Sequence, residues 1–303
     1  MIRTLLPILL LVTFTQSVFA GGPWPRKKNS GYAQVGFSYL GYNKIFNHEG
    51  KVTDLRRNVI DITGQAYVDY GLTDKITFLA VLPFKYVASG EKIVSADSSY
   101  FQDTVPAGNL FGLNMALLGI KYNIINKKVV FSAGLNAEFN TAKYDSLTTL
   151  RTGPGTFVIH PYLSVGTTFY KGKFYTLLDV GWRTRFKKYY HQTDFNFELG
   201  FSWNQKTYFI ASVSGRFNVK PVPVQDGFFS FSKNPIDNNV TLENPNGRDL
   251  HTSLYPNGQE YMGYGLKFIQ KINRVHINAA VYFGMGKMVA AAPSYNLGVA
   301  YQW

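Results

Sequence analysis

Few residues in this chain of 303 could carry out acid–base, nucleophilic or metal chemistry. Cysteine is absent, and the histidines number five: His48, His160, His191, His251 and His276. The nearest approach to a Ser/His hydrolase pattern is His251-Thr252-Ser253, in a long polar connection. His191 and Asp194 also lie close together, but short polar loops commonly contain such pairs. Neither a His-Glu-x-x-His zinc motif nor a glycine-rich phosphate loop is present. We therefore predict no enzyme activity, no cofactor and no metal site.

The elements that must position the polar residues are β-strands, because apolar and polar residues alternate with a period of two. The alternation is clear at residues 33–39, 60–69, 129–140, 195–203, 275–284 and 294–303. It is weaker at about 75–87, 109–123, 156–170, 173–187, 206–219 and 259–272. Together these segments predict about twelve strands.

The two faces of these strands differ in chemistry. One carries large apolar residues: Ile60, Val68, Phe131, Leu135, Phe197, Leu199, Ile277 and Val281. The other carries polar and charged residues: Asp61, Gln65, Glu138, Asp179, Arg183, Glu198 and His276. If the apolar face meets lipid, the polar set lines a lumen. There, either opposed charges pair and hold the interior together, or the lining sets which solutes pass.

The connections between the strands alternate in length. Short turns fall at residues 71–74, 125–126, 171–172, 204–205 and 272–273. Longer connections fall at about 44–55, 88–108, 141–155, 188–192, 220–258 and 287–291. Barrels of the bacterial outer membrane have short periplasmic turns and longer extracellular loops, whereas a soluble β-sandwich has no reason to alternate in this way. The pattern predicts an all-β fold, a transmembrane antiparallel β-barrel of about 12 strands with both termini periplasmic.

Aromatic residues support this orientation. Five of them fall where strands reach the short turns: Tyr70, Tyr122, Tyr170, Trp203 and Trp303. Such a ring is expected where amphipathic side chains meet lipid headgroups.

The two ends of the chain point to export and membrane assembly. Arg3, the apolar run from Leu5 to Phe14 and Val18-Phe19-Ala20 form a secretory signal pattern, so we predict a signal peptide at 1–20 and a barrel at 21–303. An uncleaved membrane anchor is the alternative. The last strand, Ser294 to Trp303, ends on an aromatic residue and resembles the signal read by the barrel assembly machinery. Outer-membrane lipids and that machinery are therefore expected partners.

The formal charge of +13 gathers in turns and loops rather than on a basic helix. Because no recognition motif for nucleic acid accompanies it, we predict no nucleic-acid partner. The charge either meets anionic lipid headgroups or creates a field that favours anionic solutes.

The longest connection, 220–258, contains Phe228, Phe229 and Phe231. Loops of this length are usually functional or disordered. These phenylalanines either fold into the mouth as an apolar gate, or pack the loop on itself or against the membrane surface.

The stretch A-Y-V-D-Y-G-L-T-D-K-I-T-F-L-A-V-L-P-F, residues 66–84, resembles a hairpin of the meta-pathway phenol-degradation family of outer-membrane proteins. Residues 112–122 resemble the next strand of that family, with Asn114 where the family has Asp. The resemblance implies an architecture related to fatty-acid and hydrocarbon transporter barrels, and uptake of small hydrophobic or aromatic compounds. It identifies no ligand-binding residue.

The segment before the first strand contains Trp24 between Pro23 and Pro25. Trp24 could insert into the barrel or lie in the periplasmic headgroup zone, and we favour the headgroup zone.

These observations predict a bacterial outer-membrane channel for passive uptake of small hydrophobic or aromatic molecules. The alternative is a structural or partner-binding barrel without transport activity. A continuous lumen favours the channel, whereas a lumen filled by side chains favours the alternative.

Overall fold

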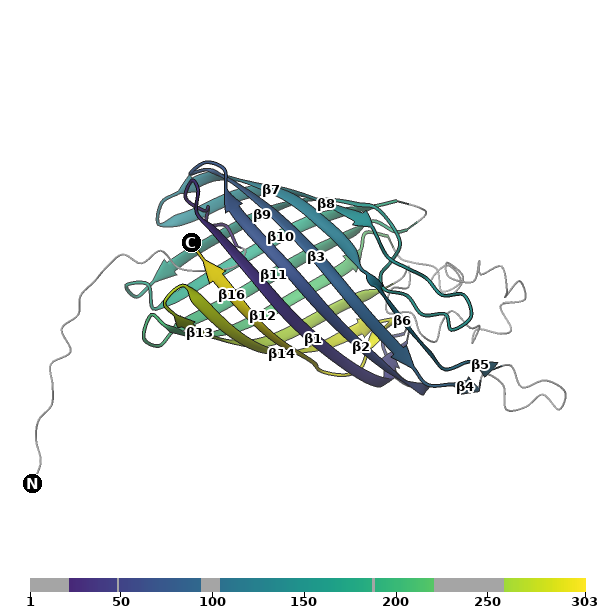
Figure 1. Cartoon of the computed structure of the whole chain (residues 1–303). Helices are drawn as coiled ribbons and strands as arrows, with labels where there is room; N and C mark the ends of the chain where they lie inside the picture. Colours follow the sequence, from purple (N-terminus) through teal and green to yellow (C-terminus); the bar gives the residue numbers. More distant parts are fainter. Residues whose placement is uncertain (1–21, 48, 94–103, 187–188, 221–258) are drawn as a thin grey trace, which may run out of the picture.

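The computed structural model describes residues 22–47, 49–93, 104–186, 189–220 and 259–303. These residues form one closed antiparallel β-barrel, which confirms the predicted fold class (Figure 1). The twelve wall strands are β1 (Gly31–Phe46), β2 (Val52–Gly71), β3 (Ile76–Ser89), β6 (Gly108–Leu113) continued by β7 (Met115–Asn126), β8 (Val129–Asn140), β9 (Val158–Phe169), β10 (Phe174–Arg185), β11 (Gln192–Ser202), β12 (Thr207–Asn218), β13 (Glu260–Ile272), β14 (Val275–Lys287) and β16 (Ser294–Gln302).

Each wall strand pairs with its neighbours in the sequence, and β1 pairs with β16 to close the barrel. Closure leaves the barrel wall without an open edge, so every wall strand has a backbone partner on both sides. Three short segments add to the wall strands: β4 (Lys92–Ile93) pairs with β5 (Thr104–Val105), and β15 (Val289–Ala290) extends the pairing of β1. No helix long and apolar enough to cross a membrane occurs among the described residues.

The two ends of the barrel differ, as the connection lengths predict. We call them the short-turn end, where β2–β3, β7–β8, β9–β10, β11–β12 and β13–β14 connect, and the long-loop end. The C-terminus lies at the short-turn end, opposite the β4–β5 hairpin (Figure 1). The predicted aromatic residues lie there too, and Tyr170 and Trp203 are the most exposed of them, at 76% and 69%. Residues with positive φ tighten these turns, among them Gln205 at 62° and Asn273 at 57°.

The first hairpin is longer than the sequence predicts. Residues 44–46 and 52–55 are strand, so the loop predicted at about 44–55 shrinks to residues 47–51. A membrane-spanning strand needs roughly 9–11 residues, whereas β2 has 20. The extra length projects beyond the other strands at the long-loop end. There neither face must meet lipid, which explains why the alternation that marks a membrane strand is missing.

The strand predicted at about 109–123 is divided in two at Asn114. β3 pairs with β7 as far as Val81↔Leu117 and with β6 from Phe84↔Leu113, so β6–β7 carries one extra residue, a β-bulge. Pro83 lies opposite and has no backbone N–H for the ladder. Its carbonyl accepts a bond from the Asn114 N–H at 2.9 Å instead.

Candidate functional site: the barrel interior

Side-chain exposure separates the two faces of the wall. Ile60, Leu135, Phe197, Leu199 and Ile277 of the predicted lipid-facing set are exposed on the outer surface. The remaining three members, Val68, Phe131 and Val281, are partly exposed on the same face. The structure therefore places the predicted lipid-facing residues on the outer surface of the barrel.

All seven predicted lumen residues lie on the opposite parity. Asp61 forms an ion pair with Lys85 at 2.5 Å, and Glu138 forms one with Arg183, also at 2.5 Å. All four side chains are nearly buried, so these pairs join neighbouring parts of the wall. Removing one partner of such a pair leaves a buried charge and costs roughly 3–5 kcal/mol.

Asp179 and Glu198 are held differently. Ser164 donates a hydrogen bond to Asp179, and Tyr175 donates one of 3.1 Å to Glu198. Within the described residues, neither carboxylate has an ion-pair partner within 4 Å. His276 is 2% exposed and packs edge-on against the Tyr32 ring at 5.8 Å.

Some inward-facing side chains in the middle of the barrel are accessible to solvent. Gln65 is exposed although it faces inward, between Asp61 and Asp69, which are only 4% and 3% exposed. Polar residues on other parts of the wall are partly exposed at similar depth: Asn196, Ser212, Lys267 and Asn296. We call this region the central chamber.

The short-turn end is filled by residues 22–28, the N-terminal plug. The Lys121 ammonium donates to the carbonyls of Gly22 at 2.6 Å and Trp24 at 3.0 Å. The Ser132 hydroxyl donates to the Pro23 carbonyl at 2.5 Å, and the Asn123 amide reaches the same oxygen at 3.5 Å. Since a proline-containing segment cannot join the strand ladder, side chains of the wall satisfy its carbonyls.

Trp24 lies inside the barrel, so the favoured prediction of a headgroup position is wrong. Its ring meets Tyr175 edge-to-face at 5.8 Å and packs on an apolar cluster with Leu177, Ile210 and Ile269. That cluster gives the physical reason, because it offers Trp24 a dry surface inside an otherwise polar barrel. The signal was present in the sequence: Leu177, Ile210 and Ile269 are apolar residues at polar-face positions.

An ion pair completes the plug. The Arg26 guanidinium bonds both oxygens of Asp69, with Nε at 2.7 Å and Nη2 at 3.0 Å. The Arg26 backbone N–H donates to the Thr77 hydroxyl at 3.0 Å, and the guanidinium lies over the Tyr32 ring at 5.2 Å. Arg26 and Lys121 are functional candidates that the sequence does not single out, because their partners lie far from them in the sequence.

The long-loop end is narrowed by residues 141–157, the mouth segment between β8 and β9. Leu150 is fully buried in a cluster with Tyr42, Leu55, Val59 and Val87, which come from β1, β2 and β3. The segment therefore reaches past β6 to the inner face of β1, β2 and β3.

Hydroxyl groups fix the mouth segment to β6 and to the connection between β10 and β11. Thr152 donates to the Leu113 carbonyl at 2.6 Å, Thr156 to the Phe186 carbonyl at 2.7 Å, and Tyr189 to the Pro154 carbonyl at 2.6 Å. The gate predicted at Phe228, Phe229 and Phe231 lies outside the described residues.

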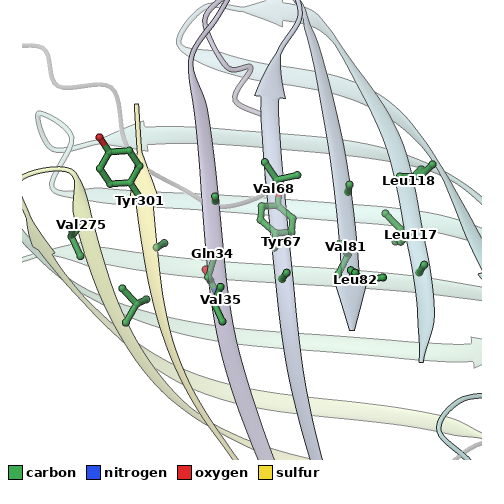
Figure 2. Close-up of a pocket in the computed structure, with 16 residues that line it drawn as sticks. Gln34, Val35, Tyr67, Val68, Val81, Leu82, Leu117, Leu118, Val275 and Tyr301 are labelled. Atoms are coloured by element: carbon green, nitrogen blue, oxygen red, sulfur yellow. The ribbon is translucent and has the colours of Figure 1, made fainter. Parts of the chain in front are cut away.

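The outer surface also has an apolar hollow of about 560 Å³, shown in Figure 2. Small residues on four adjacent strands create it: Ala33, Ala66, Ala80 and Ala116. Val35, Val68, Leu82 and Tyr301 border it on the face that carries the exposed apolar residues. Because this hollow lies on the outer face, the interior remains the candidate site for solutes.

This geometry defines the class: a closed antiparallel barrel with an apolar outside, a polar chamber and two inserted segments. A solved structure with a similar fold is the COG4313 outer membrane channel from Pseudomonas putida F1, with a TM-score of 0.63 at 12% identity over 95% of this chain and 100% of that one. Weaker likenesses are the KdgM porin (TM-score 0.48, 6% identity, 89% and 99% covered) and the toluene transporter TodX of Pseudomonas putida (0.41, 9%, 91% and 90%). The first likeness establishes a shared barrel fold.

No protein-family model and no curated protein sequence matches the chain. The resemblance of residues 66–84 to the phenol-degradation family therefore stays a prediction.

Proposed function

We propose that this protein is a channel of the bacterial outer membrane through which small hydrophobic or aromatic molecules enter passively. The observation that carries the proposal is the central chamber between two closures, neither of which belongs to the strand wall. Movement of the N-terminal plug or the mouth segment can connect the chamber to either side without breaking a wall strand. A structural barrel would not need closures of this kind.

The fold supports the location. An apolar outer surface with aromatic residues at the strand ends suits a lipid bilayer. The COG4313 structure, which shares the fold, is itself an outer-membrane channel. In this proposal the short-turn end and both termini are periplasmic, residues 1–20 are removed on export, and the protein performs no catalysis.

A neutral aromatic probe tests the proposal in living cells. Lipopolysaccharide excludes 1-N-phenylnaphthylamine, which fluoresces once it enters the membrane interior. Cells that express the protein should take the probe up faster than cells with an empty vector. Unchanged sensitivity to a large hydrophilic antibiotic serves as the control for general envelope damage.

A reversible lock on the plug sharpens the test, because the chain has no cysteine of its own. A Cβ at residue 166 would lie 2.8 Å from Pro23 Cγ, one bond from the Pro23 Cβ, which is within disulfide reach. Pro23→Cys with Gly166→Cys should reduce uptake when oxidised and restore it with reductant. Gly166→Ala controls for the added Cβ. Uptake at the empty-vector level for both the wild type and a Trp24→Ser variant would show that the barrel is structural.

A further inference from the structure

Two arginines share one carboxylate oxygen on the interior wall near the long-loop end. Asp194 on β11 lies directly opposite Arg216 on β12 and Gly181 on β10, in the strand register. Its Oδ1 lies 3.0 Å from His160 Nε2. The other oxygen is 3.7 Å from Arg183 Nη1 and 3.9 Å from Arg216 Nη2, too far for hydrogen bonds of normal length. Asp194 thus holds both guanidinium groups close together without satisfying either.

Both arginines keep unused donors. Within the described residues the Nε atoms of Arg183 and Arg216 are buried and have no hydrogen-bond partner. The closest contact of the Arg183 guanidinium is with Glu138. A guanidinium presents five N–H donors in a planar fork, and buried donors without acceptors are costly. The two guanidinium groups therefore have more N–H donors than there are hydrogen-bond acceptors around them.

The local charges are unequal as well. Arg183 and Arg216 lie within 4 Å of two carboxylates, Glu138 and Asp194, and Arg185 adds a third positive charge on the same interior face of β10. Arg185 is 8% exposed and lies over the Tyr189 ring at 4.2 Å. On the far wall, by contrast, Asp61 and Lys85 form a closed pair. One added negative charge would make the number of negative charges equal to the number of arginines in this part of the wall.

Aromatic rings flank the same place. Arg216 lies over the Tyr261 ring at 5.5 Å, and His160 stacks on Tyr162 at 5.6 Å. The Arg216 side chain is 31% exposed, so it is accessible from the lumen. Gly181 leaves the space that the His160–Asp194 contact occupies, because a Cβ there would lie 2.1 Å from His160 Nε2.

From these observations we infer that Arg183 and Arg216 form a binding site for the carboxylate of a small aromatic acid that enters at the long-loop end. A carboxylate is the planar anion that a guanidinium fork binds in two-point fashion. The nearby tyrosines offer the ring an apolar surface. This inference rests on the proposed function and adds that, among the small aromatic molecules that the channel admits, those with an acid group bind at this site.

The test compares benzoate with benzamide, which has nearly the same shape and no charge. Calorimetric titration of the purified wild-type barrel in detergent at pH 8 should give at least tenfold tighter binding of benzoate. Arg216→Gln should weaken benzoate binding about tenfold and leave benzamide binding unchanged. Arg216→Lys keeps the charge but loses the fork, and should recover only part of the affinity.

Lys271→Gln is the matched control, because it removes one positive charge from the interior near the short-turn end of β13. It should leave benzoate affinity within a factor of two. Heat-modifiable mobility on gels verifies that each variant is folded. Equal binding of benzoate and benzamide, or equal losses in Arg216→Gln and Lys271→Gln, would overturn the inference. Neither result touches the proposed function, since uptake of the neutral naphthylamine probe is measured separately.

Discussion

The two ends of this barrel are closed by different means. At the short-turn end, residues 22–28 fill the lumen. At the same end the Trp303 ring covers Gly31, where β1 and β16 meet to close the barrel; we call this junction the seam. At the long-loop end an internal segment crosses the mouth and buries Leu150. The N-terminal plug is held mainly through an ion pair and hydrogen bonds, with Trp24 as its one apolar anchor, whereas the mouth segment is held through apolar packing and hydroxyl groups. A polar anchor weakens when one donor or charge is replaced, whereas an apolar anchor weakens with the volume it loses.

The short-turn end also contains the contact that joins the end of the last strand to the start of the first. Gly31 and Trp303 exchange two backbone hydrogen bonds of 3.1 Å, and a Cβ at residue 31 would lie 2.2 Å from the Trp303 ring. Deletion of Trp303 removes both bonds and the stacked contact with Tyr301. We expect the largest effect here: loss of heat-modifiable barrel from the outer-membrane fraction.

Trp203→Ala is the control for that deletion, because Trp203 is an exposed aromatic residue at the same end but lies in a turn away from the seam. It should give a normal amount of folded barrel. Equal loss in both variants would mean that the aromatic ring in general matters, and not the seam.

The second largest effect is expected from breaking the Arg26–Asp69 ion pair of the N-terminal plug. Arg26→Met leaves Asp69 buried without its cation, at a cost of roughly 3–5 kcal/mol. The plug should detach and the ion conductance of the barrel in planar bilayers should rise. The Arg26→Met/Asp69→Asn double variant carries no unpaired charge and should conduct less than the single variant. Lys28→Met, an exposed charge change in the same segment, should conduct as the wild type does.

The mouth segment provides the matching experiment at the other end. Leu150→Ala removes a fully buried side chain, a change that costs roughly 2–5 kcal/mol in well-packed cores. The segment should loosen and become open to trypsin at Lys143 and Arg151, which mass spectrometry of the fragments detects. Leu147→Ala changes a 66% exposed leucine of the same segment and should leave cleavage at the wild-type rate. Rapid cleavage in the wild type would contradict a packed mouth.

The sequence predicts the wall well and the closures poorly, for a physical reason. Lipid on one side and water on the other impose a period of two on every spanning strand, which is why the faces at Leu135 or Glu138 can be predicted. The closures depend on contacts between distant segments. Trp24 meets Tyr175, and Leu150 meets Val59, without any periodic pattern around Trp24 or Leu150.

The arginine site shows the same limit. Arg183 and Glu138 are on the predicted interior face, but Asp194 and Arg216 come together only through the register of β11 and β12. A slip of one residue would place one of them on the lipid side. Strand register is set by the closed barrel as a whole, so sequence periodicity alone cannot give it.

The smallest expected effect separates the individual polar anchors of the plug. Ser132→Ala removes one hydrogen bond to the Pro23 carbonyl, while Lys121 still holds the carbonyls on either side of it. A single neutral bond contributes about 1 kcal/mol, which corresponds to roughly a fivefold change in an equilibrium. Conductance records should therefore show about five times more open time and an unchanged open-state amplitude. Ser212→Ala, another interior hydroxyl but one that faces the central chamber, should change neither quantity. If Ser132→Ala also behaves as the wild type does, the plug is held by the Arg26–Asp69 pair and the Trp24 contact alone, and the carbonyl contacts of Ser132 follow its position without fixing it.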